Sequence, residues 1–93
     1  MDTLIFSQSA IFRLQQLGAN YFRVTGKRFR LSDQDGILTL LKQSVLASDK
    51  SVRKAYDDFV MELNKRQIDG LSARGVKLRL PMSAEYLSAK AAG

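Results

Sequence analysis

The stretch YFRVTGKRFRL, residues Tyr21–Leu31, carries the strongest fold signal in the sequence. Apolar and polar residues alternate along it on both sides of Thr25-Gly26, which is typical of a β-hairpin that buries one face. A two-residue loop there would place Phe22 opposite Phe29, whereas a four-residue loop would place Val24 opposite Phe29. The longer loop is favoured, because Thr-Gly is not a preferred pair for a two-residue hairpin loop.

The polar face of this predicted hairpin is strongly basic. It contains four cations and no carboxylate: Arg23, Lys27, Arg28 and Arg30. Either loop length sets two arginines opposite each other, which disfavours the ribbon by a few tenths to about 1 kcal/mol. A bound phosphate or carboxylate would relieve that repulsion through charge-assisted hydrogen bonds. The alternative is a solvated face that nearby acids, such as Asp33 or Asp35, neutralise within the fold.

The composition predicts one globular domain over residues 1–93, with 45% hydrophobic and 26% charged residues. Fifteen Lys and Arg against nine Asp and Glu give a formal net charge of +6, which favours an anionic partner. The absence of Cys favours a reducing, cytoplasmic setting. The opening MDTLIFSQSA lacks the features of a signal peptide, and no apolar run approaches the ~20 residues of a membrane span.

Helices are expected on both sides of the hairpin. Residues Ser7–Leu17 have apolar side chains at helical spacing, and Gly18 is the expected terminator. A second helix is predicted to start at Ser32, which has capping-box spacing to Asp35, and to end near Ser48-Asp49. The predicted fold is therefore of the α+β class: three core helices, a β-hairpin at about 21–31 and a short C-terminal strand.

The third helix begins at the Ser48-Asp49 cap, fades around 65–68 and has the clearest amphipathic pattern. Turns are predicted at Asp69-Gly70 and Arg74-Gly75, followed by a strand at about 76–80. Residues 82–93 are expected to form a short helix or a frayed tail. The predicted core comprises Ile11, Leu14, Leu17, Phe22, Val24, Phe29, Leu31, Leu38, Leu41, Val45, Val52, Tyr56, Phe59, Val60, Leu63, Val76 and Leu78.

The sequence contains few residues that could support a catalytic function. The chain contains neither His nor Cys, which removes the commonest general base, metal ligand and nucleophile. Asp33–Gly36 lacks the remaining ligands of a calcium loop, and Gly26-Lys27 lacks the earlier glycine and following Ser or Thr of a phosphate loop. The acids Asp57, Asp58 and Glu62 fit a solvated helix face. We expect no enzymatic activity, no cofactor and no metal.

A second binding pattern overlaps the basic hairpin. The second and third helices have the spacing of a helix-turn-helix, with Lys50, Arg53 and Lys54 near the start of the reading helix. Residues 67–80 would then form a wing with Lys77 and Arg79 near phosphates. The full set of candidate binding residues is Arg23, Lys27, Arg28, Arg30, Lys50, Arg53, Lys54, Lys77 and Arg79.

The sequence thus predicts a small, basic, non-enzymatic binding module in the cytoplasm. The leading hypothesis is a nucleic-acid-binding or regulatory protein that neutralises the phosphates of DNA or RNA. The alternative is a protein–protein adaptor, chaperone-like protein or inhibitor that contacts an acidic surface on a larger assembly. Homodimer formation is compatible with either, and no membrane partner is expected.

Overall fold

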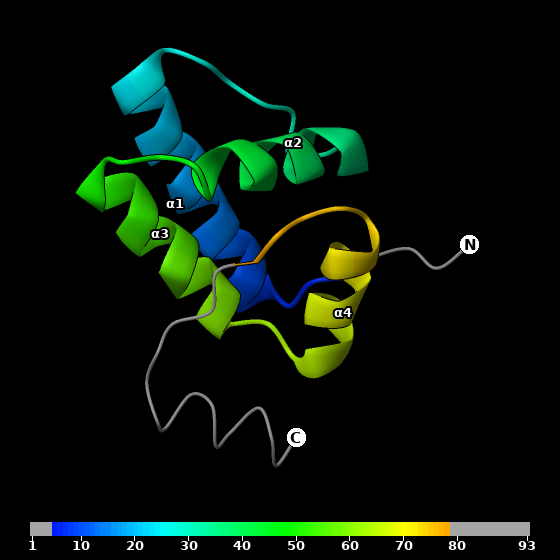
Figure 1. The fold of residues 1–93 in the computed structure, drawn as a ribbon. Helices are drawn as coiled ribbons and strands as arrows, with labels where there is room; N and C mark the ends of the chain where they lie inside the picture. The colour runs from blue at the N-terminus through cyan, green and yellow to red at the C-terminus, as the bar shows by residue number, and fades with distance from the viewer. Residues whose placement is uncertain (1–4, 79–93) are drawn as a thin grey trace.

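Residues 5–78 are described by the computed structural model, and they form four helices and no strand (Figure 1). The helices are α1 (Gln8–Thr25), α2 (Gln34–Ser44), α3 (Lys50–Met61) and α4 (Lys65–Ala73). The described chain is therefore an all-α fold, and the α+β prediction is wrong. The predicted strand fails over residues 76–78, which form no strand, while 79–80 and the predicted tail 82–93 lie outside the described residues.

The predicted hairpin is absent because its first half is the end of α1. Tyr21 is buried together with Leu14 and Leu17, and these residues share the core-facing side of one long helix. Phe22 and Val24, which the alternating pattern would bury, are 39% and 43% exposed. The helical period therefore prevails over the two-residue period, and residues 27–30 are a connection rather than a returning strand.

Two glycines define how α1 ends and packs. The helix starts next to the predicted position: Ser7 is its N-cap, and the Ser7 Oγ accepts a hydrogen bond from the Ala10 N–H at 3.1 Å. Gly18 does not end the helix; a Cβ at Gly18 would lie 3.3 Å from Leu31 Cδ1, so this glycine lets the connection pack closely. The terminator is Gly26, whose φ of 76° is left-handed.

The connection between α1 and α2 is held against the helices at several points. The Phe29 ring packs on the Tyr21 ring with centroids 5.5 Å apart. Gly36, in the first turn of α2, lies so close to the backbone of Arg30 that a Cβ there would clash with it. The N-cap of α2 is Asp33 rather than Ser32, and its side chain makes no capping hydrogen bond.

Helices α1 and α3 run side by side in opposite directions, with α2 toward the top of the view and α4 toward the bottom (Figure 1). Near the start of α1, the Phe6 ring packs edge-on against Phe59 of α3, with centroids 5.7 Å apart. Near the end of α1, Arg23 donates a hydrogen bond to Ser51 in the first turn of α3. The Asp49 cap of α3 was predicted, and its Oδ1 accepts from the N–H groups of Ser51 and Val52.

Helix α4 replaces the predicted turn at Asp69-Gly70 and the fading end of the third helix. It starts with a capping box: Asn64 Oδ1 accepts from the Gln67 N–H at 2.8 Å, and Gln67 Oε1 accepts from the Asn64 N–H at 3.0 Å. It ends as a Schellman motif at the predicted Arg74-Gly75 turn. The N–H groups of Gly75 and Val76 donate to the carbonyls of Ser72 and Leu71, and Gly75 has a φ of 86°.

The core lies between α1, α3 and the facing sides of α2 and α4. The buried hydrophobic residues are Ala10, Leu14, Leu17, Tyr21, Leu40, Leu41, Val52, Ala55, Tyr56, Phe59, Val60, Leu63, Leu71 and Val76. Of the predicted core, Ile11, Phe22 and Val24 are wrong because they lie on exposed positions of α1. Phe29, Leu31, Leu38, Val45 and Leu78 are half-buried at the edge of this cluster.

Candidate anion-binding surface

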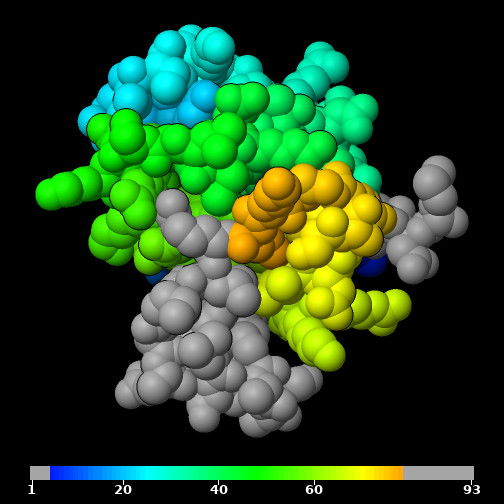
Figure 2. All heavy atoms as spheres, viewed as in Figure 1, coloured from blue at the N-terminus to red at the C-terminus, as the bar shows by residue number. Residues whose placement is uncertain are grey.

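Arg23 joins the last turns of α1 to the first turn of α3. Its Nη2 donates to Ser51 Oγ at 2.8 Å and to Asn20 Oδ1 at 3.4 Å, although the side chain stays exposed. In the space-filling view the cyan end of α1 lies next to the green start of α3 (Figure 2). The structure therefore brings together two basic segments that are 28 residues apart in the sequence.

One carboxylate lies within this junction. Ser51 Oγ donates to Asp49 Oδ1 at 2.5 Å while accepting from Arg23, so the three side chains form a chain of hydrogen bonds. The pKa of Asp49 is lowered from its usual value of 3.8, first by the Ser51 hydroxyl, then by the backbone N–H groups of Val52 and Ser51 and by the charge of Arg23. Arg23 is thus partly compensated within the fold, contrary to the expectation of an uncompensated hairpin face.

The remaining cations of the predicted hairpin lie on the connection after α1. Lys27, Arg28 and Arg30 are exposed. The Arg28 guanidinium lies over the Phe22 ring, with its Cζ 4.3 Å from the ring centroid, which is a cation–π contact. No ion pair between described residues joins these cations to Asp33 or Asp35. The predicted neutralisation by these two acids is therefore not seen within residues 5–78.

The start of α3 adds further positive charge beside Arg23. Lys50, Arg53 and Lys54 are exposed, and Lys54 Nζ forms an ion pair with Asp58 Oδ2 at 3.1 Å, one turn further along the helix. Such exposed pairs contribute little to stability and are easily exchanged for another anion. Lys50 and Arg53 form no ion pair with a described carboxylate.

The wing predicted over residues 67–80 does not form over its first half, because α4 occupies residues 65–73. Lys77 is exposed on the segment after α4, and a Cβ added at Gly75, two residues earlier, would lie 3.7 Å from Lys42 Nζ. No described hydrogen bond or ion pair ties Lys77 to Arg23 or to α3. Arg79 lies outside the described residues. The site therefore consists of the end of α1, the connection and the start of α3.

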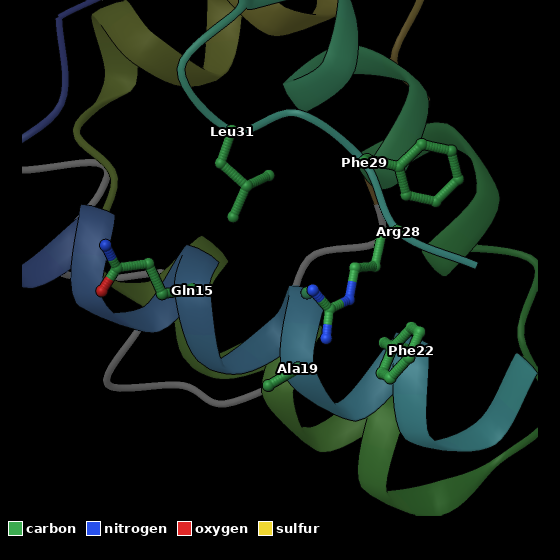
Figure 3. Close-up of a pocket in the computed structure, with 7 residues that line it drawn as sticks. Gln15, Ala19, Phe22, Arg28, Phe29 and Leu31 are labelled. Carbon is green, nitrogen blue, oxygen red and sulfur yellow. The ribbon is translucent and has the colours of Figure 1, made fainter. Parts of the chain in front are cut away.

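A hollow of about 370 Å³ opens between α1 and the connection (Figure 3). The close-up shows Arg28 and Leu31 reaching from the connection toward α1, with the Phe22 ring beside the Arg28 guanidinium and the Gln15 amide pointing away from both. The residues that line the hollow are Gln15, Gly18, Ala19, Phe22, Arg28, Phe29 and Leu31. The hollow thus combines the Phe22 ring and the Arg28 guanidinium, while the Phe29 ring turns away from it to pack on Tyr21.

Sequence reasoning missed this hollow, because it placed Phe22 and Phe29 on one buried face of a ribbon. The signal for the correct reading was the spacing of Ala10, Leu14, Leu17 and Tyr21, which continues one helical stripe through Gly18. Extending the helix turns Phe22 outward, where it lines the hollow.

Within residues 5–78, no cluster of three or more acidic residues is placed to hold a metal ion. None of the four helices in that range has the length and apolar character needed to cross a bilayer. No protein-family model, curated protein or solved structure matches the chain. The proposals that follow therefore depend on the geometry and charge of the chain itself.

Proposed function

We propose that the protein is a small, non-enzymatic nucleic-acid-binding module. The observation that carries the proposal is the contact between Arg23 and Ser51, which gathers the cations of two distant segments at one end of the molecule. Among described residues, the candidate cations here are exposed, and Lys54 alone is paired with a carboxylate. The gathered cations are Arg23, Lys27, Arg28, Lys50, Arg53 and Lys54, with Arg30 further along the connection.

Phosphate neutralisation is the mechanism that this arrangement supports. Exposed Lys and Arg side chains bind phosphates mainly by releasing condensed counterions, so their affinity for nucleic acid falls steeply with salt. The Lys54–Asp58 and Arg23–Ser51 contacts are exposed, and a phosphate can compete for the same donors. The net charge of +6 adds long-range attraction for a polyanion. A cytoplasmic location, where nucleic acid is accessible, is part of this proposal.

A protein–protein adaptor is the second candidate, and exposed apolar residues on α1 favour it. Ile11 and Phe12 are 43% and 55% exposed, and Phe12 lies beside a second hollow that Arg13 and Glu62 also line. An interface built on such residues would keep most of its affinity in roughly 0.3 M salt, because exposed charge pairs are screened there and apolar contacts are not.

A charge-matched pair of variants tests the leading proposal. The test variant replaces Lys27, Arg28 and Arg30 with Gln; all three are exposed and belong to the connection. The control replaces Lys42, Lys65 and Arg66 with Gln, which removes the same charge from exposed positions on α2 and α4. Binding to a mixed-sequence oligonucleotide is measured by fluorescence anisotropy at fixed salt. We expect the test variant to bind at least about tenfold more weakly than the control; equal affinities would refute the proposed site.

A further inference from the structure

We infer that the hollow between α1 and the connection receives an unpaired nucleobase, so that the protein binds single-stranded DNA or RNA in preference to duplex. This inference rests on the proposed nucleic-acid-binding function and adds to it the form of the ligand. The occupant is one base of a strand whose phosphates lie along the neighbouring cations.

The walls of the hollow suit a flat aromatic ring. Phe22 is 39% exposed, and the Arg28 guanidinium lies over its ring, so a base that enters the hollow can stack on this supported guanidinium plane (Figure 3). A volume of about 370 Å³ lies at the lower end of the range of small-ligand pockets. Gln15 lines the opposite end of the hollow; its amide points away from Arg28 in Figure 3 and has to rotate inward to hydrogen-bond a base edge.

The charges around the hollow suit a strand rather than a neutral ligand. Arg28 lies at its edge, with Cζ 4.3 Å from the Phe22 centroid, so the guanidinium is already held on an aromatic face. Lys27 precedes Arg28 on the connection and Arg30 follows two residues later, so phosphates on either side of an inserted base meet cations. Arg23 follows Phe22 on α1 and continues the positive surface toward α3.

Single strands are favoured because only they present an unstacked base at low cost. Proteins that bind single strands without sequence preference combine a cationic track with aromatic side chains on which bases stack. A base within a duplex would have to be unpaired and unstacked first. A duplex would therefore contact only the phosphate-binding cations and leave the hollow empty.

The test compares Phe22→Ala with Phe12→Ala, a matched control that removes an exposed ring from the same helix but outside this hollow. The probes are a fluorescent oligothymidylate, an abasic strand of the same length and charge, and a duplex. We expect Phe22→Ala to weaken oligothymidylate binding by about 5- to 100-fold, the loss typical of one stacked base. We expect no effect on the abasic strand, and no effect of Phe12→Ala on any probe.

A second variant guards against a folding defect in the first. Ala19→Leu adds a side chain at an exposed helical position that lines the hollow, and it keeps every aromatic ring. We expect it to weaken oligothymidylate binding while it leaves the melting temperature and abasic-strand binding unchanged.

The outcomes separate the two proposals. If the abasic strand and the duplex bind as tightly as oligothymidylate, and neither variant changes this, the base-binding inference is overturned while phosphate binding stands. If none of the three probes binds in low salt, the proposed function fails, and this inference fails with it. Binding only to a Glu-rich peptide that carries an aromatic residue would likewise overturn the inference in favour of a protein partner.

Discussion

Replacing Gly36 with Ala tests the arrangement of the connection and α2 through the sign of a stability change. In an ordinary helix this substitution stabilises by up to about 1 kcal/mol, because Ala is the better helix former. Here a Cβ would lie 2.8 Å from the carbonyl carbon of Arg30 and 3.0 Å from its nitrogen, and still closer to its oxygen. These are backbone atoms, so no side-chain rotation can relieve the clash.

The expected result is a loss of stability of about 1–3 kcal/mol, the usual cost of forcing extra atoms into a packed site. The assay is urea denaturation followed by circular dichroism. Gly18→Ala is the matched control, since its Cβ would meet only side-chain atoms: Leu31 Cδ1 at 3.3 Å, which can shift, and Leu40 Cδ2 at 3.7 Å, an ordinary contact. We expect that control to change stability by less than about 1 kcal/mol. A Gly36→Ala protein as stable as the wild type would refute the described path of residues 30–36.

Three further predictions test the core, the cap and the helix end. Phe59→Ala removes a fully buried ring that packs against Phe6 and should cost about 3–5 kcal/mol, enough to unfold a small domain; a loss under about 1 kcal/mol in a denaturation curve would contradict the core. Asp49→Asn keeps a capping side chain but removes the carboxylate, whose pKa the Ser51 hydroxyl and the Val52 N–H lower from its usual value of 3.8. The wild type should therefore be the more stable protein above that pH and lose its advantage as pH falls through the lower folded pKa, whereas a pH-independent difference would refute this role. The same variant should also bind oligonucleotides more tightly, because a carboxylate leaves the basic junction. Gly26→Ala should lower the melting temperature, since φ is 76° there although no neighbour crowds the site; an unchanged melting temperature would argue against the left-handed end of α1.

Much of the helical core could be predicted from local sequence. The Ser7 and Asp49 caps are local signals, because a short polar side chain precedes an apolar helical pattern in each case. The apolar positions from Val52 in α3 to Leu63 just after it were assigned correctly, since a strongly amphipathic segment can bury only one face.

The stretch from Tyr21 to Leu31 was misread because two periods fit it. Phe22 and Val24 alternate with polar residues, but Tyr21 also continues the stripe of Leu14 and Leu17. A strand needs a partner for its backbone groups, whereas a helix satisfies them internally, and the long preceding helix already supplies the nucleus. Helix α4 was missed for a related reason: Gly70 suggested a turn, although Asn64 and Gln67 have capping-box spacing.

The candidate site was predictable as a set of residues but not as a surface. The exposure of the basic residues follows from their chemistry. Their grouping depends on the Arg23–Ser51 contact, which joins residues 28 positions apart, and no local pattern encodes such a contact. The roles of Gly18 and Gly36 likewise depend on their neighbours Leu31 and Arg30 in the folded chain.

The salt dependence of oligonucleotide binding tests the central claim most directly. If the end of α1, the connection and the start of α3 neutralise phosphates, log K should fall linearly with log salt. For a single strand, replacing Lys27, Arg28 and Arg30 with Gln should reduce the slope by about 2, at about 0.7 for each lost phosphate contact. A wild-type protein that binds no oligonucleotide at low salt, or a slope that the triple variant leaves unchanged, would contradict the account.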